Sequence, residues 1–109
     1  NFEIPFSTRS CFQYVGDVAE VFVRATSASW TGALLSDISE TTHSTDEVIA
    51  AIQAEVPNAA VTCAKTPRVS PSDGFETSVL RQIIGDIEES SLREGIRKTV
   101  ALYRKIAAR

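Results

Sequence analysis

A helix with a well-defined start, set between two short apolar segments, constrains the fold of this chain more than any other feature. The helix begins at the capping box Ser44–Glu47, in which the first and last side chains satisfy each other's free backbone donors. It ends before Pro57. Residues 33–38 and 59–64 on either side have the composition of short, mostly buried strands. The order strand–helix–strand predicts a right-handed parallel crossover.

Shorter elements are predicted on either side of this unit. Residues 11–15 combine β-branched and aromatic side chains, which is typical of a strand. Asp17 predicts the N-cap of a helix that runs to about Ser27. A short helix is expected over 78–84, closed by Gly85. Between these elements, the prolines and serines of residues 65–74 predict a surface loop, a common location for binding residues.

The last predicted helix begins at a second capping box, Ser91–Glu94. Apolar residues repeat along it at helical spacing and are expected to face a core: Leu92, Ile96, Val100, Tyr103 and Ile106. Basic residues cluster on the same helix: Arg93, Arg97, Lys98, Arg104, Lys105 and Arg109. We expect them to form a solvated outer face, with cations favoured near the helix C-terminus. The alternative is a surface for nucleic acid or membrane.

Composition describes one ordinary globular unit of 109 residues, 43% of them apolar. A net charge of −3 argues against a general affinity for nucleic acid, and no apolar run is long enough to span a bilayer. Cys11 and Cys63 match no metal spacing and are expected to be buried free thiols in a reducing cytoplasm, although one disulfide remains open. Because the chain starts at Asn1 and contains no methionine, we expect it to be part of a longer protein.

No pattern of catalytic residues is complete in this sequence. His43 is the single histidine and is expected at the surface. The aspartates lack the paired spacing of glycosidases, and no phosphate-binding glycine motif occurs. Arg9 and Arg68 lie in non-helical stretches, where a guanidinium can bind a phosphate or carboxylate through two hydrogen bonds. The alternative for both is an exposed charge without a partner.

Four motifs follow one another in an order that resembles the C-terminal part of extended short-chain dehydrogenases/reductases, the NAD(P)-dependent epimerases, dehydratases and reductases. Residues 12–19 look like aromatic-x-x-Val-x-Asp-x-Ala, and residues 32–38 lie where the family has a glycine followed by a strand. Residues 45–52 resemble its next helix, and residues 91–100 closely resemble its closing S-L-x-E-G helix. The resemblance covers nearly the whole chain.

The resemblance implies a substrate-binding lobe that closes over the nicotinamide and substrate. A Rossmann domain, expected upstream of Asn1, would supply the Gly-rich turn, the Tyr-x-x-x-Lys catalytic group and most of the NAD or NADP site. Arg9 or Ser10 falls near the family's phosphate-binding arginine, displaced by one place. Arg68 falls near the second such arginine, before a turn that reads Glu76-Thr77-Ser78 here. Ser36 replaces the usual aromatic residue, which leaves a smaller sugar acid or hydroxy acid as a competitor to a nucleotide sugar.

We therefore expect residues 1–109 to form a small α/β lobe with a two- to three-stranded sheet and three to four helices, lacking the Rossmann domain. It would bind substrate for a cytoplasmic NAD(P)-dependent epimerase, dehydratase or reductase through Arg9, Ser10 and Arg68, with no catalytic residue, metal or bound cofactor of its own. The alternative is a non-catalytic binding or regulatory module. Exposed apolar residues (Phe2, Ile4, Phe6 and Phe12) further predict a homo-oligomer, with no nucleic-acid or membrane partner.

Overall fold

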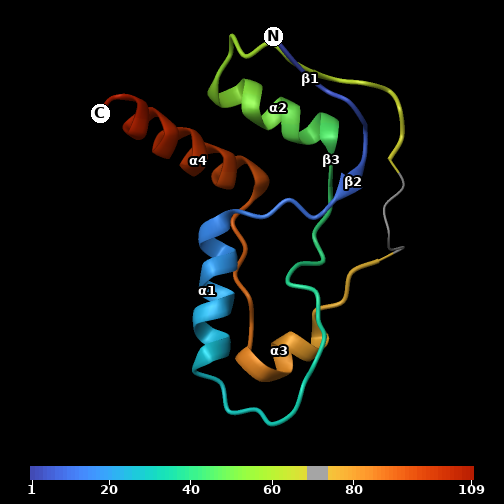
Figure 1. The fold of residues 1–109 in the computed structure, drawn as a ribbon, viewed down its shortest axis with the longest axis vertical. Coiled ribbons are helices and arrows are strands. Elements are labelled where there is room, and N and C mark those ends of the chain that lie inside the picture. Colours follow the sequence, from blue (N-terminus) through green and yellow to red (C-terminus); the bar gives the residue numbers. More distant parts are fainter. Residues whose placement is uncertain (69–73) are drawn as a thin grey trace.

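The computed structural model describes residues 1–68 and 74–109, so half of the predicted loop 65–74, including Asp73, lies outside the described residues. In chain order the elements are β1 (Phe2–Ile4), β2 (Arg9–Ser10), α1 (Val15–Thr26), β3 (His43–Ser44), α2 (Thr45–Glu55), β4 (Val61–Cys63), α3 (Ser78–Ile84) and α4 (Leu92–Ala107) (Figure 1). The expected small α/β class is confirmed. The strands form two separate pairs, however, instead of one sheet.

The parallel pair joins β1 to β4, with α2 between them in the chain. Phe2 lies opposite Val61, and Ile4 lies opposite Cys63. The strand predicted over 59–64 is thus confirmed over its central residues. It pairs in parallel, as predicted, but its partner is β1 and not the segment 33–38. The other pair is antiparallel and joins β2 to β3, which ends where α2 begins.

The segment 33–38, predicted as the other strand of the crossover, forms no strand in the structure. It is extended but joins neither sheet, and the Leu35 side chain is 94% exposed. A strand requires a neighbour for its backbone N–H and C=O groups, and among the described residues this stretch has only the bond from the Asp37 N–H to the Glu76 carbonyl (3.1 Å), which does not make a ladder. The local apolar pattern was therefore insufficient to predict the element.

The start of α1 differs from the sequence prediction of a strand over 11–15 followed by an N-cap at Asp17. Residues 11–14 pair with no strand, and the helix begins at Val15 with Tyr14 at the N-cap position. Asp17 lies in the first turn and does not cap the helix, because its carboxylate accepts hydrogen bonds from Ser90 instead. At the other end, Arg24 joins α1 to the end of α3 through the carbonyl of Ile84, and to the following segment through the carbonyl of Asp86.

The capping boxes decide where α2 and α4 begin. At α2 the box is complete: the Glu47 N–H donates to Ser44 Oγ (3.1 Å), and the Ser44 N–H donates to Glu47 Oε2 (2.7 Å). At α4 only half forms, with Glu94 N–H donating to Ser91 Oγ (3.2 Å), since the Glu94 carboxylate pairs with Arg97. The predicted α3 and its Gly85 terminus are confirmed, the glycine having a φ of 79°.

Part of the apolar stripe on α4 does not face a core. The helix packs against α2, but Tyr103 is 68% exposed and Ile106 is 51% exposed. The prediction that the stripe lies inside is therefore wrong for its C-terminal half, which extends beyond the residues that could cover it.

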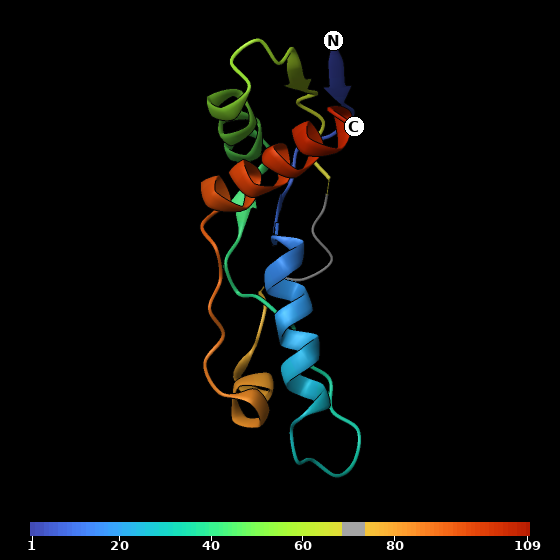
Figure 2. The same cartoon turned by 90° about the vertical axis from the view of Figure 1, so that its left-hand side faces the viewer.

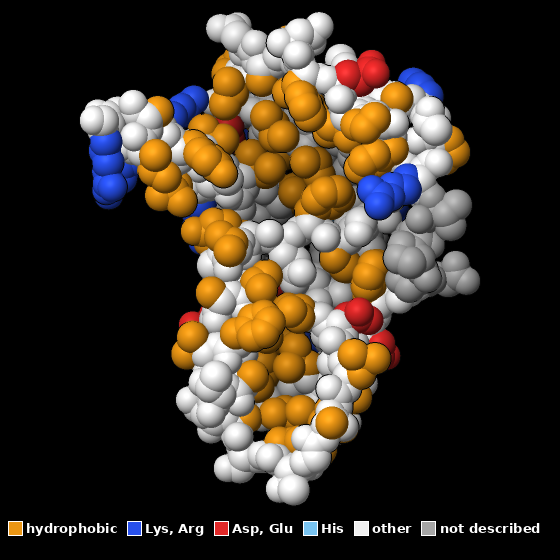
Figure 3. All heavy atoms as spheres, in the orientation of Figure 1, with side chains coloured by type: hydrophobic (Ala, Val, Ile, Leu, Met, Phe, Trp, Pro, Cys, Tyr) orange, Lys and Arg blue, Asp and Glu red, His pale blue; other side chains and the backbone are white. Residues whose placement is uncertain are grey.

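The molecule is thin, with extents of 49 × 38 × 18 Å. Its radius of gyration is 16.4 Å, against about 13 Å for a compact domain of this length. The exposed area of 7844 Å² is roughly a third larger than that of a typical monomer of 11.8 kDa. Figures 1 and 2 show why: β1, β4, α2 and α4 lie at one end, and α1 and α3 at the other. On the face shown in Figure 3, apolar side chains gather over both ends.

Candidate functional site

The first predicted site residues, Arg9 and Ser10, form β2 and pair with Ser44 and His43. Arg9 Nη1 donates to the Thr42 carbonyl (3.1 Å) and hydroxyl (3.2 Å). Its Nη2 lies 3.4 Å from Glu47 Oε1. The Arg9 guanidinium is therefore held by its own chain at the start of α2, although its side chain is 57% exposed.

Glu47 links this arginine to the helix start. The hydrogen bond from the Ser44 N–H, followed by the charges of Arg9 and His43, lowers the pKa of the Glu47 carboxyl. His43 Nδ1 lies 3.7 Å from Glu47 Oε2, and the His43 side chain is 24% exposed. His43 is thus half-buried beside a carboxylate, not freely exposed as the sequence suggested.

Arg68 lies on the neighbouring stretch of backbone. Its N–H donates to the Ser7 carbonyl (2.8 Å), and the Ser7 N–H donates to the Thr66 carbonyl (2.8 Å). These bonds form a parallel bridge between Ser7 and Pro67. The Arg68 side chain is stacked over Phe6, with Cζ 4.9 Å from the ring centre. The bridge therefore places Arg68 opposite Thr8, the residue before Arg9, so the two arginines come from neighbouring backbone segments.

A cavity of about 360 Å³ adjoins this backbone. Ser7, Asp46, Cys63 and Lys65 contribute to its walls. The Cys63 thiol lies 3.3 Å from Asp46 Oδ1, and that hydrogen bond raises the pKa of Cys63, so the group is a neutral thiol. The Ser7 hydroxyl donates to the Thr66 carbonyl (3.4 Å), whereas Lys65 adds a positive charge three residues before Arg68, which suits an anionic ligand.

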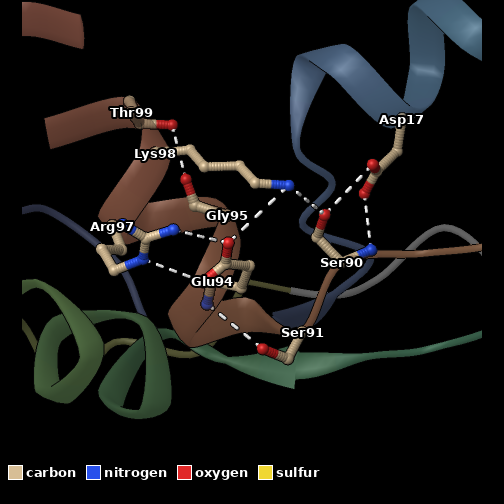
Figure 4. A network of polar contacts seen from close by, with 8 residues as sticks. All are labelled: Asp17, Ser90, Ser91, Glu94, Gly95, Arg97, Lys98 and Thr99. Carbon is tan, nitrogen blue, oxygen red and sulfur yellow. Dashed lines mark hydrogen bonds and ion pairs between the residues drawn. The ribbon is translucent and has the colours of Figure 1, made fainter. Parts of the chain in front are cut away.

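A second polar cluster joins α1 to the start of α4 (Figure 4). Asp17 accepts from the Ser90 N–H (2.7 Å) and hydroxyl (3.1 Å). Lys98 Nζ donates to Ser90 Oγ (3.3 Å) and lies 5.0 Å from the centre of the Tyr14 ring. An added Cβ on Gly95 would lie 3.1 Å from Tyr14 Cβ, so the glycine permits the close approach of Tyr14 to α4.

Ser90 was not predicted as a functional residue from the sequence, and Lys98 was predicted only as part of the basic cluster, although a signal was present. The motif at 12–19 holds Asp17, and the motif at 91–100 holds Lys98; the structure brings these two motifs together. A cavity of about 360 Å³ opens beside them, lined by Asp17, His43, Glu89 and seven other residues. The network within Figure 4 is internally paired, which is typical of a structural junction.

An apolar groove of about 230 Å³ separates α1 from α3 at the other end of the molecule. Val21 and Phe22 of α1, Leu34 and Ile38 of the extended segment, and Ile83 of α3 contribute to it. Phe22 is 61% exposed and Leu34 is 49% exposed. The segment 33–38 forms part of the wall of this groove, and few polar groups line it.

The turn Glu76-Thr77-Ser78 is tied to the segment 37–40. Thr77 is fully buried, and both its N–H (3.0 Å) and its hydroxyl donate to Glu40 Oε1. Asp37 Oδ2 accepts from the Glu76 N–H (2.9 Å). The hydroxyl of Thr77 lowers the pKa of Glu40, and hydrogen bonding from Ser78 lowers the pKa of Glu76. These carboxylates cap α3 from outside the helix.

These shifts predict acid sensitivity. A carboxyl whose folded pKa lies below its ordinary value of 4.5 stabilises the fold above that value and loses this contribution as the pH falls through the folded pKa. We expect the melting temperature to be nearly constant from about pH 8 to 6 and to fall below about pH 4.5. Circular dichroism at successive pH values measures this. Thr77→Val should lower the melting temperature at neutral pH and flatten its acid dependence, whereas the control Glu88→Gln should change neither.

Other chemistry is limited in the described residues. Residues 1–68 and 74–109 contain no group of three or more side chains suited to hold a metal ion. No helix in this part of the chain is long and apolar enough to cross a membrane. Both cysteines are free thiols, as expected, but each is half-buried.

Comparisons with known proteins give one significant similarity at the level of structure. No protein family matches the sequence, and no curated protein is similar to it. Among solved structures, the chain resembles the NAD-dependent NDP-hexosamine 5,6-dehydratase TunA, involved in tunicamycin biosynthesis, with a TM-score of 0.72 and 25% sequence identity. The similarity covers 94% of this chain but 36% of that enzyme, whose C-terminal part it matches. It supports the resemblance to nicotinamide-dependent sugar-modifying enzymes drawn from the motifs.

Proposed function

We propose that this chain is the substrate-binding part of an NAD-dependent enzyme that modifies a nucleotide sugar. The observation that supports this most strongly is the similarity in fold to an NDP-hexosamine dehydratase over 94% of the chain. The positions of Arg9 and Arg68 on adjoining backbones add to it. A nucleotide sugar carries a diphosphate, and two arginines on neighbouring strands suit its two negative charges.

In this proposal the basic residues bind the diphosphate of the substrate. Arg68 and the nearby Lys65 would face the diphosphate beside the cavity that Ser7 lines. Arg9 would also bind the diphosphate by giving up its ion pair with Glu47. That ion pair is exposed to solvent and is therefore weak. Ser10, half-buried in β2, would support Arg9 through the backbone pairing with His43.

The chain's own residues do not fit a dinucleotide. No G-x-G-x-x-G sequence occurs in the 109 residues, and no Tyr is followed by Lys at the fourth place. NAD, hydride transfer and the catalytic group would therefore come from another domain of the same protein. The present chain would bind and orient the sugar nucleotide.

The exposed apolar face supports the presence of such a domain. The area in excess of a compact monomer, about 1,900 Å², is larger than the about 800 Å² that each partner contributes to a standard interface. Between Arg24 and Asp37 the sequence has no charged residue, and Leu35 is almost fully exposed. An uncharged segment that joins neither sheet of this chain suits the edge of a neighbouring sheet.

The proposal is tested by titrating the complete protein that carries this chain with UDP and, separately, with NAD. UDP supplies the diphosphate and nucleoside common to many nucleotide sugars. We expect saturable binding of both ligands by calorimetry, with inorganic phosphate much weaker than UDP. Binding of UDP without NAD would favour the alternative, a non-catalytic binding module. Absence of UDP binding would contradict the proposed substrate class.

A further inference from the structure

Phe6 and Arg68 form a stacked pair at the edge of the proposed diphosphate site. The Arg68 Cζ lies 4.9 Å from the centre of the Phe6 ring, within the distance at which a guanidinium is attracted to an aromatic face. Phe6 is half-buried and Arg68 is exposed, so the ring has a fixed position and the charge faces solvent. We infer that Phe6 is a positioning residue, whose ring holds the Arg68 guanidinium ready for the diphosphate of the substrate; this rests on the proposed function.

The backbone makes this pairing a fixed feature of the fold. Hydrogen bonds join Ser7 N–H to Thr66 and Arg68 N–H to Ser7, both at 2.8 Å. In this parallel register Arg68 lies opposite Thr8, and Phe6 is its diagonal neighbour, so the two residues stay close as long as the bridge between Ser7 and Pro67 persists. The aromatic ring and the guanidinium come from these two clamped positions, so their contact requires no long-range adjustment.

Stacking on Phe6 also leaves the N–H groups of the Arg68 guanidinium available to a ligand. A planar guanidinium that lies over a ring uses its face, while its N–H groups point outward along the edge. Within residues 1–68 and 74–109, no oxygen accepts a hydrogen bond from the Arg68 side chain. Arg9 differs, because Thr42 and Glu47 already occupy its N–H groups. Of the two arginines, Arg68 is therefore the one prepared to bind an anion.

A long arginine side chain loses rotamer freedom when it binds a ligand. The Phe6 ring restricts the Arg68 side chain before the ligand arrives, so less freedom is lost on binding. The effect of Phe6 on affinity must then pass through Arg68. This distinguishes a positioning role from a merely structural one.

The test is calorimetric titration of the complete protein with UDP. We expect Phe6→Leu to weaken UDP binding about two- to five-fold, the size of an exposed cation–π contact. Phe6→Tyr keeps an aromatic face and should bind UDP as the unmodified protein does. Phe2→Leu makes the same substitution four residues earlier, on β1, and should also leave UDP affinity unchanged.

A double-mutant cycle separates the possible outcomes. In the Arg68→Ala background, Phe6→Leu should have no further effect on UDP affinity. An equal loss in both backgrounds, or unchanged affinity in Phe6→Leu alone, would overturn the positioning role while leaving the proposed function in place. If the unmodified protein fails to bind UDP, both the proposed function and this inference are wrong.

Discussion

We expect Asp17→Ala to lower the free energy of unfolding by about 2–4 kcal/mol. The Asp17 carboxylate accepts two hydrogen bonds from Ser90, 73 residues further along the sequence. Hydrogen bonds to a charged acceptor are stronger than neutral ones, and the part-buried Ser90 N–H would lose its partner. Because this contact joins α1 to the residue before α4, its loss weakens the junction between the two ends of a thin molecule. Urea denaturation measures the change.

Two further variants make this expectation specific. Asp17→Asn retains one carbonyl acceptor for the Ser90 N–H and should lose less stability than Asp17→Ala. Glu20→Ala removes an exposed carboxylate from the same helix and should change the free energy of unfolding by less than about 0.5 kcal/mol. If Asp17→Ala were no more destabilising than Glu20→Ala, the junction of Figure 4 would not hold the two ends together.

The second large effect concerns ligand affinity. We expect Arg68→Ala to weaken UDP binding by the complete protein about 10- to 100-fold, because charge-assisted hydrogen bonds to a diphosphate would be lost. Arg68→Lys keeps the charge but lacks the planar pair of donors, so its affinity should fall between those of the alanine variant and the unmodified protein. Calorimetry gives the dissociation constants directly.

The control for this effect is Arg93→Ala, which removes an exposed arginine from α4. It removes one positive charge, as Arg68→Ala does, but lies outside the proposed site, so UDP affinity should be nearly unchanged. Equal losses in the Arg68 and Arg93 variants would indicate general electrostatic attraction. Unchanged affinity in Arg68→Ala would remove this residue from the substrate site.

The helices could largely be predicted from the sequence, because their starts depend on local chemistry. Ser44 and Glu47 lie three residues apart and cap each other, so no tertiary information is needed to place α2. Ser91 acts similarly at α4, and Gly85 ends α3 by adopting a positive φ. By contrast, Asp17 looked like a cap but serves a distant contact, which no local pattern reveals.

The strands were less predictable because they depend on partners. The segment 33–38 has a strand's composition but pairs with no strand in the described residues, whereas β1, which was not predicted as a strand, pairs with β4 at a sequence separation of 59 residues. For the site, the motifs pointed to Arg9 and Arg68. Stacking of Phe6 on Arg68 and the commitment of Arg9 to Glu47 depend on side-chain positions in space.

The thinness of the molecule has a consequence for its tolerance of substitution. In a body 18 Å across, the described apolar residues that are truly buried are few: Val21, Ile49 and Ala51. A compact domain concentrates its sensitive positions in a central core, and exposure then indicates which changes are harmless. In this molecule, many positions that do not tolerate substitution should lie on the exposed apolar face. A survey of variants in the complete protein would therefore find that substitutions are not tolerated at exposed residues such as Leu35. For this chain, exposure is a poor guide to which residues can change.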